Sequence, residues 1–260
     1  MSQGSTPRGH SKVAIVVLVA VTVAIGLLVV NVRPAAASSG PGDPQFAGYE
    51  ISAQQTTTES ASVTVNVPKI YCVRNSNRKE RQYFFLFQEL TAEGGDSWAQ
   101  VVGQCHLGEE TYVAEGIACT SYSGCSTCPV DVAYGDSVTL SEDVGALPDS
   151  DIGASVDDTT SNMSTSCLSF DAGSNGGNLY TGSCAIDYTH NLFVDSRPNP
   201  GQFCGPTQVL PFSKVSFTNA TLNGEAFQSG ENFNMTYNGR VEVNTGKLKD
   251  GGESFNELYV

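Results

Sequence analysis

Residues 62–68 read Ser62-Val63-Thr64-Val65-Asn66-Val67-Pro68, and this stretch alternates strictly between polar and apolar side chains. A period of two places the three valines on one face of an extended chain and the polar residues on the other. The pattern is typical of a half-buried β-strand, and the closing proline suits a strand end. Similar patterns follow along the chain, so we expect an all-β protein.

The remaining expected strands are short, and turn-forming residues separate them. Asn223-Gly224 and Asn238-Gly239 predict tight hairpin turns, and a turn at 175–177 predicts a hairpin between the strands that flank it. Residues 119–128 and most of 141–160 are predicted as loops, because they are rich in Gly and small polar residues. The expected strands cover residues 83–88, 98–104, 111–118, 134–140, 162–170, 179–188, 209–218, 222–227, 233–237, 240–243 and 253–260. We therefore predict a large sandwich of two antiparallel sheets.

The N-terminus has the composition of a targeting segment. A polar, basic start is followed by an uncharged apolar run over residues 13–30 and by a small-residue site that ends at Ala37. This order predicts a secretory signal over residues 1–37, a linker over 38–44 and a single sandwich domain over 45–260. The apolar run reaches the lower limit of membrane-spanning length, so an uncleaved helical anchor through residues 13–30 is the alternative. In both interpretations the body of the protein is secreted or anchored outside the cytoplasm.

The charge balance narrows the class of partner. The 260 residues contain 13 Lys and Arg against 27 Asp and Glu, which gives a formal net charge of −14. A nucleic-acid partner is excluded because phosphate binding requires a basic surface. No sequence pattern points to a cofactor, and we expect none.

All eight cysteines lie in the exported part, where an even number predicts disulfides. The sequence leaves their connectivity open, with Cys167 and Cys184 as the favoured pair because they flank the expected hairpin. A zinc site built from Cys119, Cys125, Cys128 and His106 is the less favoured alternative, so no metal is expected.

One acid stands out among the candidate catalytic residues. Asp195 ends the apolar run Leu192-Phe193-Val194 and precedes a loop rich in Pro and Gly. Such a position is either a solvated strand end or the acid of an active site. The chain lacks a Gly-x-Ser-x-Gly nucleophile motif and the Asp-Thr-Gly or Asp-Ser-Gly motif of aspartic proteases. A serine or aspartic protease is therefore disfavoured.

The order of several short motifs resembles the glutamic peptidases (eqolisins), which are acid proteases built on a concanavalin-like β-sandwich. The resemblance spans most of residues 43–260. It rests on Gly135-Asp136-Ser137-Val138, which is similar to Gly-Asp-Ser-Ile, on Leu192 to Pro198, which is similar to Trp-Ile-Val-Glu-Arg-Pro, and on Phe212 to Ala220, which is similar to Phe-Gly-x-Val-x-Phe-Thr-Asn-Ala.

The resemblance implies a catalytic Glu and Gln that face each other on a concave sheet. The acid activates a water and then protonates the leaving group, and the amide holds the water and the oxyanion. Asp195 stands at the Glu position. The Gln motif falls on Val101 without gaps, whereas a shift of one residue places Gln100 there, on the opposite face of the strand. Glu115 is the acid of a stretch similar to an aromatic Trp-Tyr-Glu-Trp-Tyr-Pro segment of the family.

Two functions follow from this resemblance. The first is a divergent glutamic-type endopeptidase that hydrolyses polypeptides with Asp195, Gln100 and Glu115 as site residues. The second is a catalytically inactive surface module that binds peptide or glycan on the same sheet.

Overall fold

The computed structural model describes residues 46–52, 59–72, 82–92, 95–120, 124–145, 151–169, 176–184 and 209–260. The predicted signal or anchor, the linker and Asp195 lie outside these residues. Within the described part of the chain, no helix has the length and apolar character that crossing a membrane requires. The only helical element described there is a 3₁₀ turn, η1 (Asp250–Gly252).

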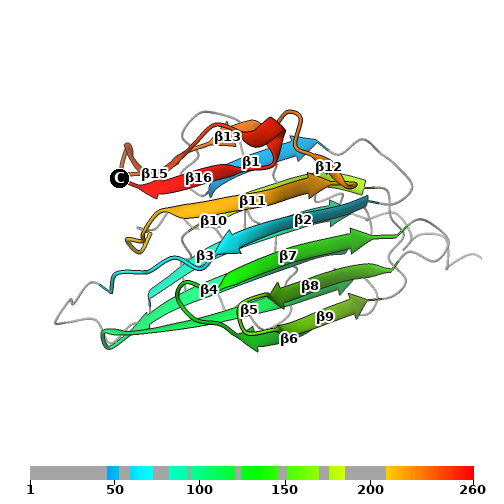
Figure 1. Ribbon diagram of the computed structural model, residues 1–260, viewed down its shortest axis with the longest axis horizontal. Helices are drawn as coiled ribbons and strands as arrows, with labels where there is room; N and C mark the ends of the chain where they lie inside the picture. Colours follow the sequence, from blue (N-terminus) through cyan, green and yellow to red (C-terminus); the bar gives the residue numbers. More distant parts are fainter. Residues whose placement is uncertain are drawn as a thin grey trace, which may run out of the picture. The chain divides into compact units, whose positions relative to one another are not determined.

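The described chain folds into two antiparallel sheets, and the predicted β-sandwich is confirmed (Figure 1). The first sheet contains seven strands in the order β13 (Glu231–Phe233), β1 (Phe46–Ser52), β10 (Gly176–Cys184), β3 (Gln82–Ala92), β4 (Gly95–His106), β5 (Glu109–Thr120) and β6 (Gly124–Asp131). The path of the nine-stranded sheet is β14 (Met235–Tyr237), β15 (Arg240–Thr245), β16 (Phe255–Tyr259), β11 (Val215–Leu222), β2 (Glu59–Asn66), β7 (Ser137–Val144), β8 (Ile152–Asp158) and β9 (Met163–Ser169), with β12 (Glu225–Ala226) paired to β11.

The main core lies between the two sheets. On β2, Val63 and Val65 are fully buried, so the alternation in residues 62–68 is confirmed as a strand with one apolar face. β3 is central in its sheet and buries aromatic side chains on both faces, as its sequence predicts. Phe84 and Leu86 enter the core between the sheets, whereas Phe85 and Phe87 belong to a second apolar cluster on the other face.

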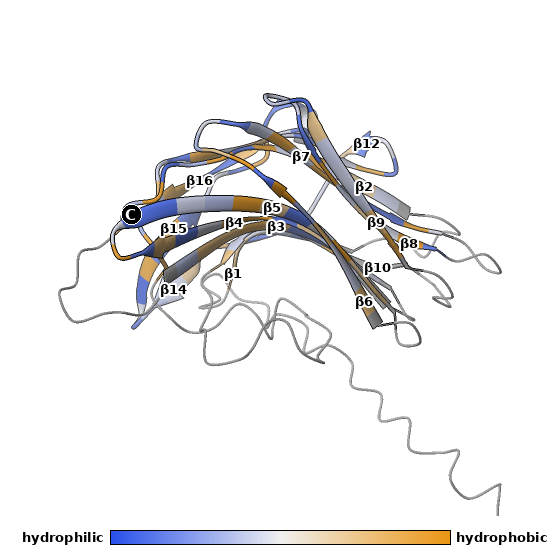
Figure 2. Ribbon diagram, turned by 90° about the horizontal axis from the view of Figure 1, so that it is seen from below, coloured by the Kyte–Doolittle hydropathy of each residue, from blue (hydrophilic) through white to orange (hydrophobic). Residues whose placement is uncertain are grey.

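That other face of the seven-stranded sheet is called the outer face below, because it is turned away from the nine-stranded sheet. Figure 2 shows β3, β4 and β5 arched, with the outer face on the inside of the arch. Its apolar cluster is buried and consists of Phe46, Tyr83, Phe85, Phe87, Val102, Tyr180, Cys184 and Phe233.

Turn residues act as predicted at two hairpins. Asn223-Gly224 joins β11 to β12, and Asn238-Gly239 joins β14 to β15. All four residues have positive φ, between 50° and 77°, which matches the turn type that the right-handed twist of paired strands requires.

Three predictions about loops and turns are wrong. Residues 124–131 form the edge strand β6 rather than a Cys-rich loop; its polar composition and Pro129 are tolerated because an edge strand lacks a partner on one side. Residues 141–160 contain the end of β7 and all of β8. The predicted hairpin at 175–177 does not exist, because β9 pairs with β8 and β10 pairs with β1 and β3 in the other sheet.

Small residues in β8 reflect close packing of the two sheets rather than a loop. A side-chain carbon on Gly116 of β5 would lie 2.7 Å from the Ala154 carbonyl oxygen of β8. The Ser97 hydroxyl of β4 also donates to the Gly153 carbonyl oxygen at 2.5 Å. Backbones that approach this closely leave no room for large side chains.

The expected strand over residues 209–218 begins later than predicted. Strand β11 starts at Val215, and Phe212 makes only an isolated bridge to Ile70. Pro211 contributes to this late start because it has no N–H for a ladder.

Three disulfides are formed among the described residues. They join Cys72 to Cys105, Cys119 to Cys125, and Cys128 to Cys167. The favoured pairing of Cys167 with Cys184 is therefore wrong, because Cys167 is bonded to Cys128 and its strand β9 does not form the predicted hairpin with β10. The zinc alternative is also wrong, because all three of its cysteines are oxidised.

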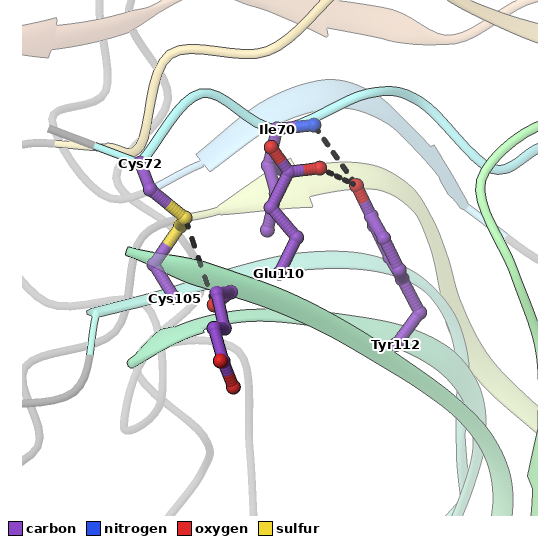
Figure 3. The surroundings of a disulfide bond; sticks show 6 residues. Ile70, Cys72, Cys105, Glu110 and Tyr112 are labelled. Carbon is purple, nitrogen blue, oxygen red and sulfur yellow. Dashed lines mark hydrogen bonds between the residues drawn. A yellow bond between two sulfur atoms is a disulfide. The ribbon is translucent and has the colours of Figure 1, made fainter. Parts of the chain in front are cut away.

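The Cys72–Cys105 disulfide ties the segment after β2 to the end of β4 (Figure 3). Beside it, the Tyr112 hydroxyl accepts the Ile70 N–H at 3.1 Å and donates to Glu110 at 3.2 Å. Burial raises the pKa of Tyr112 to about 12, so the phenol stays protonated and keeps donating at any physiological pH.

Candidate active site

Strand pairing brings Gln100 and Glu115 together on the outer face. Gln100 of β4 lies directly opposite Glu115 of β5 in the antiparallel register. Val101 points to the other side, where it is 2% exposed in the core between the sheets. The alternation predicted for this strand is therefore confirmed, and Gln100, rather than Val101, has its side chain on the same face as Glu115.

The two side chains form a direct hydrogen bond. The Gln100 Nε2 donates to Glu115 Oε1 at 2.6 Å. Glu115 is only 8% exposed, and this burial raises the pKa of its carboxyl, while the hydrogen bond from Gln100 opposes the rise. A carboxyl in this setting takes up a proton at less acidic pH than a solvated Glu.

Apolar side chains surround the pair. Phe87 of β3 is the register partner of Gln100 on the side away from Glu115. Next along the face, Trp98 and Ile117 are register partners and form a small buried cluster with Cys119. Interactions between polar groups are stronger in such a water-poor environment than at an open surface.

The third predicted site residue, Asp195, lies outside the described residues. The structure thus brings together Gln100 and Glu115 and leaves the placement of Asp195 untested. Within the described ranges, no group of three or more His, Cys, Asp or Glu residues is arranged to hold a metal ion.

Two buried acids of the nine-stranded sheet were missed from the sequence. Glu142 of β7 and Glu257 of β16 are 1% and 0% exposed, and both point from the nine-stranded sheet into the core. The alternation Val138-x-Leu140-x-Glu142-x-Val144 would have revealed Glu142, because an acid occupies a position of the buried series there. Treating residues 141–160 as loop concealed this signal.

Comparison with solved structures shows where this fold occurs. A crystal structure of scytalidoglutamic peptidase with a peptide-based transition-state analogue superposes with a TM-score of 0.59 at 16% identity, covering 84% of this chain and 99% of that chain. SCP-B, a member of the eqolisin family of peptidases in complex with the tripeptide Ala-Ile-His, gives a TM-score of 0.54 at 18% identity with the same coverage.

No protein-family model matches the chain. No curated protein matches it either. The structural likeness, at identities of 16% and 18%, concerns the fold alone: this chain shares the β-sandwich of the eqolisin peptidases.

Proposed function

We propose that the chain is an exported acid endopeptidase of the glutamic type, which hydrolyses polypeptides through a carboxylate-activated water. The hydrogen bond between Gln100 and Glu115 carries this proposal. It supplies an amide donor and a carboxyl on the outer face of a sheet whose fold is shared with peptidases. The three disulfides among the described residues support export, because such bonds persist in oxidising compartments.

The proposed roles follow from the chemistry of amide hydrolysis. Asp195 acts as general base: it takes a proton from water while the water oxygen bonds to the scissile carbonyl carbon. Gln100 uses its second amide N–H to donate to the developing oxyanion. Glu115 fixes the orientation of that amide by accepting its first N–H. Asp195 then returns the proton to the leaving nitrogen as the C–N bond breaks.

A protease assay at acid pH tests the proposal on the full-length protein. We expect Asp195→Ala to abolish cleavage of an unfolded protein substrate, and Gln100→Leu to lower kcat by roughly 10²–10³-fold, the usual cost of losing one oxyanion donor. Gln104→Leu is the matched control, because Gln104 lies on the same strand and the same face but away from Glu115. Equal activity of Asp195→Ala and the unmodified protein would remove Asp195 from the mechanism.

The second candidate function is a catalytically inactive module that binds peptide or glycan. It is favoured by the same hydrogen bond, because one of the two Gln100 N–H groups is already satisfied inside the protein. Calorimetric titration with peptides or oligosaccharides, in the absence of any cleavage, would select this function over proteolysis.

A further inference from the structure

A buried carboxyl lies on the opposite side of β4 from the Gln100–Glu115 pair. Glu142 reaches across from β7 of the nine-stranded sheet and accepts two hydrogen bonds from the seven-stranded sheet. Its Oε1 accepts the Ala99 backbone N–H at 2.9 Å, and its Oε2 accepts the Gln88 amide at 2.8 Å. Gln88 and Ala99 are register partners on β3 and β4. One carboxyl therefore holds both strands at one point.

The point that Glu142 holds is adjacent to the candidate site. Ala99 directly precedes Gln100, and the neighbouring register pair, Phe87 and Gln100, carries its side chains on the outer face. A strand N–H ordinarily lies in the plane of its sheet. The Ala99 N–H instead points to an acid in the core, so the position of this carboxyl fixes the tilt of the peptide unit between Trp98 and Ala99, one residue before Gln100.

The hydrogen bonds continue from Glu142 into β10. Gln88 Oε1 accepts from the Thr181 hydroxyl at 3.5 Å, which makes a chain of three side chains, Glu142–Gln88–Thr181. This chain has two satisfied forms because an amide turns over easily and a hydroxyl both donates and accepts. With an ionised Glu142, the Gln88 N–H₂ donates to the acid. With a protonated Glu142, the acid donates to Gln88 Oε1 and the Gln88 N–H₂ turns to the Thr181 oxygen.

The surroundings of Glu142 favour the proton-bearing form at acid pH. Full burial raises its pKa well above the ordinary Glu value, and the neighbouring Asp143 adds to the rise. Within the nine-stranded sheet, the register neighbours of Glu142 are Ala61 of β2 and Ala154 of β8. Across the core, Glu142 contacts Gln88 of β3 and Ala99 of β4. Asp143 is the only charged group among the described residues that contributes to the shift.

We propose that Glu142 is a positioning residue whose protonation, accommodated by rotation of the Gln88 amide, sets through the Ala99 N–H where β4 holds Gln100. Through the chain Glu142–Gln88–Thr181, a change of pH in the core between the sheets alters the position of residues on the outer face. Its relevance to catalysis rests on the function proposed above, but the structural coupling does not.

Trp98 makes the coupling measurable without any activity. It is the only tryptophan of the chain, it precedes Ala99 directly, and it is 5% exposed on the outer face. We expect the fluorescence of the folded protein to change above the ordinary Glu pH range, with one transition that belongs to Glu142 and a separate contribution from Glu115, whose pKa burial also raises. Glu142→Gln mimics the protonated acid permanently, so we expect the transition to be lost in this variant. Glu115→Gln, on the outer face itself, is the control that should retain it.

Each result decides one question. Retention of the full transition in Glu142→Gln would overturn the proposal, whatever the activity. Loss of the transition in a protein without protease activity would support the coupling and count against the proposed function. In an active protein, Glu142→Gln should also move the alkaline fall of kcat to higher pH with KM unchanged, which a loss of stability alone would not do.

A second variant covers the case in which Glu142→Gln fails to fold. Thr181→Val removes the far end of the chain and keeps the side-chain shape. We expect it to shift the midpoint of the Glu142 transition seen by Trp98. An unchanged midpoint would overturn the role proposed for the chain Glu142–Gln88–Thr181.

Discussion

Raising the pH from about 5 to about 8 should lower the melting temperature of the protein by roughly 10 °C, because Glu257 keeps its proton only in the folded state. Its carboxyl is fully buried between the sheets, and this burial raises its pKa to about 8. The Ser183 hydroxyl donates to its Oε2, while Oε1 has no hydrogen-bond partner among the described residues. A neutral carboxyl tolerates that position far better than a charged one.

The sign follows from the two pKa values. Below the ordinary Glu pKa both states are protonated, and the contribution of Glu257 is fully present. As the pH rises, the unfolded chain ionises first, so stability falls progressively until the folded pKa near 8 is reached. The total loss is on the order of 4 kcal/mol, at about 1.4 kcal/mol per pKa unit. Glu142 and Glu115, whose pKa values are also raised by burial, act in the same direction.

Calorimetry of Glu257→Gln against the unmodified protein measures this effect. The variant should show a flatter dependence of melting temperature on pH, because its amide cannot ionise. Glu253→Gln removes an exposed acid nearby and should leave the dependence unchanged. Parallel curves for Glu257→Gln and the unmodified protein would show that Glu257 does not titrate as described.

Gly182→Ala should prevent β1 and β10 from pairing in the seven-stranded sheet. A side-chain carbon at this position would lie 1.9 Å from the Ala47 carbonyl oxygen and 2.7 Å from the Gly48 Cα, both on β1. Backbone atoms cannot move aside as the end of a flexible side chain can, so β1 and β10 would have to separate. Loss of this pairing should cost more than about 4 kcal/mol, which places the substitution among the most destabilising single changes.

Gly153→Ala is the matched control for this experiment. It makes the same substitution in strand β8, where the nearest atom would be the end of the exposed Leu168 side chain at 3.2 Å. We expect a change within about 1 kcal/mol for the control. Denaturant unfolding, or the yield of folded protein if Gly182→Ala does not fold, provides the comparison. Similar midpoints for the two variants would contradict the close approach of β1 and β10.

The sequence predicts the sandwich well wherever side chains alternate or turn residues are specific. Residues 62–68, the aromatic β3 and the two Asn-Gly hairpins all follow from local patterns. The failures occur where composition depends on a distant neighbour. Ala154 is small because β5 packs directly against it, and β6 is polar because it lies at an edge. Neither cause is visible within the segment itself.

The candidate site was predictable only in part for the same reason. Period-two alternation is enough to separate Gln100 from Val101. Pairing with Glu115 depends on the register between β4 and β5, which the turn at Leu107-Gly108 sets through two positive φ angles. The role of Glu142 depends on which sheet faces β4, and that information is not local.

The position of β10 in its sheet has a consequence for the order of folding. β10 (Gly176–Cys184) pairs with β1 on one side and with β3 on the other, although both partners precede it by a long stretch of chain. In the other sheet, β2 likewise pairs with β11 (Val215–Leu222), which comes much later in the sequence. Contacts this distant in sequence make folding slow. During synthesis the chain therefore completes neither sheet until its last quarter has appeared, and its early strands need protection from aggregation until then.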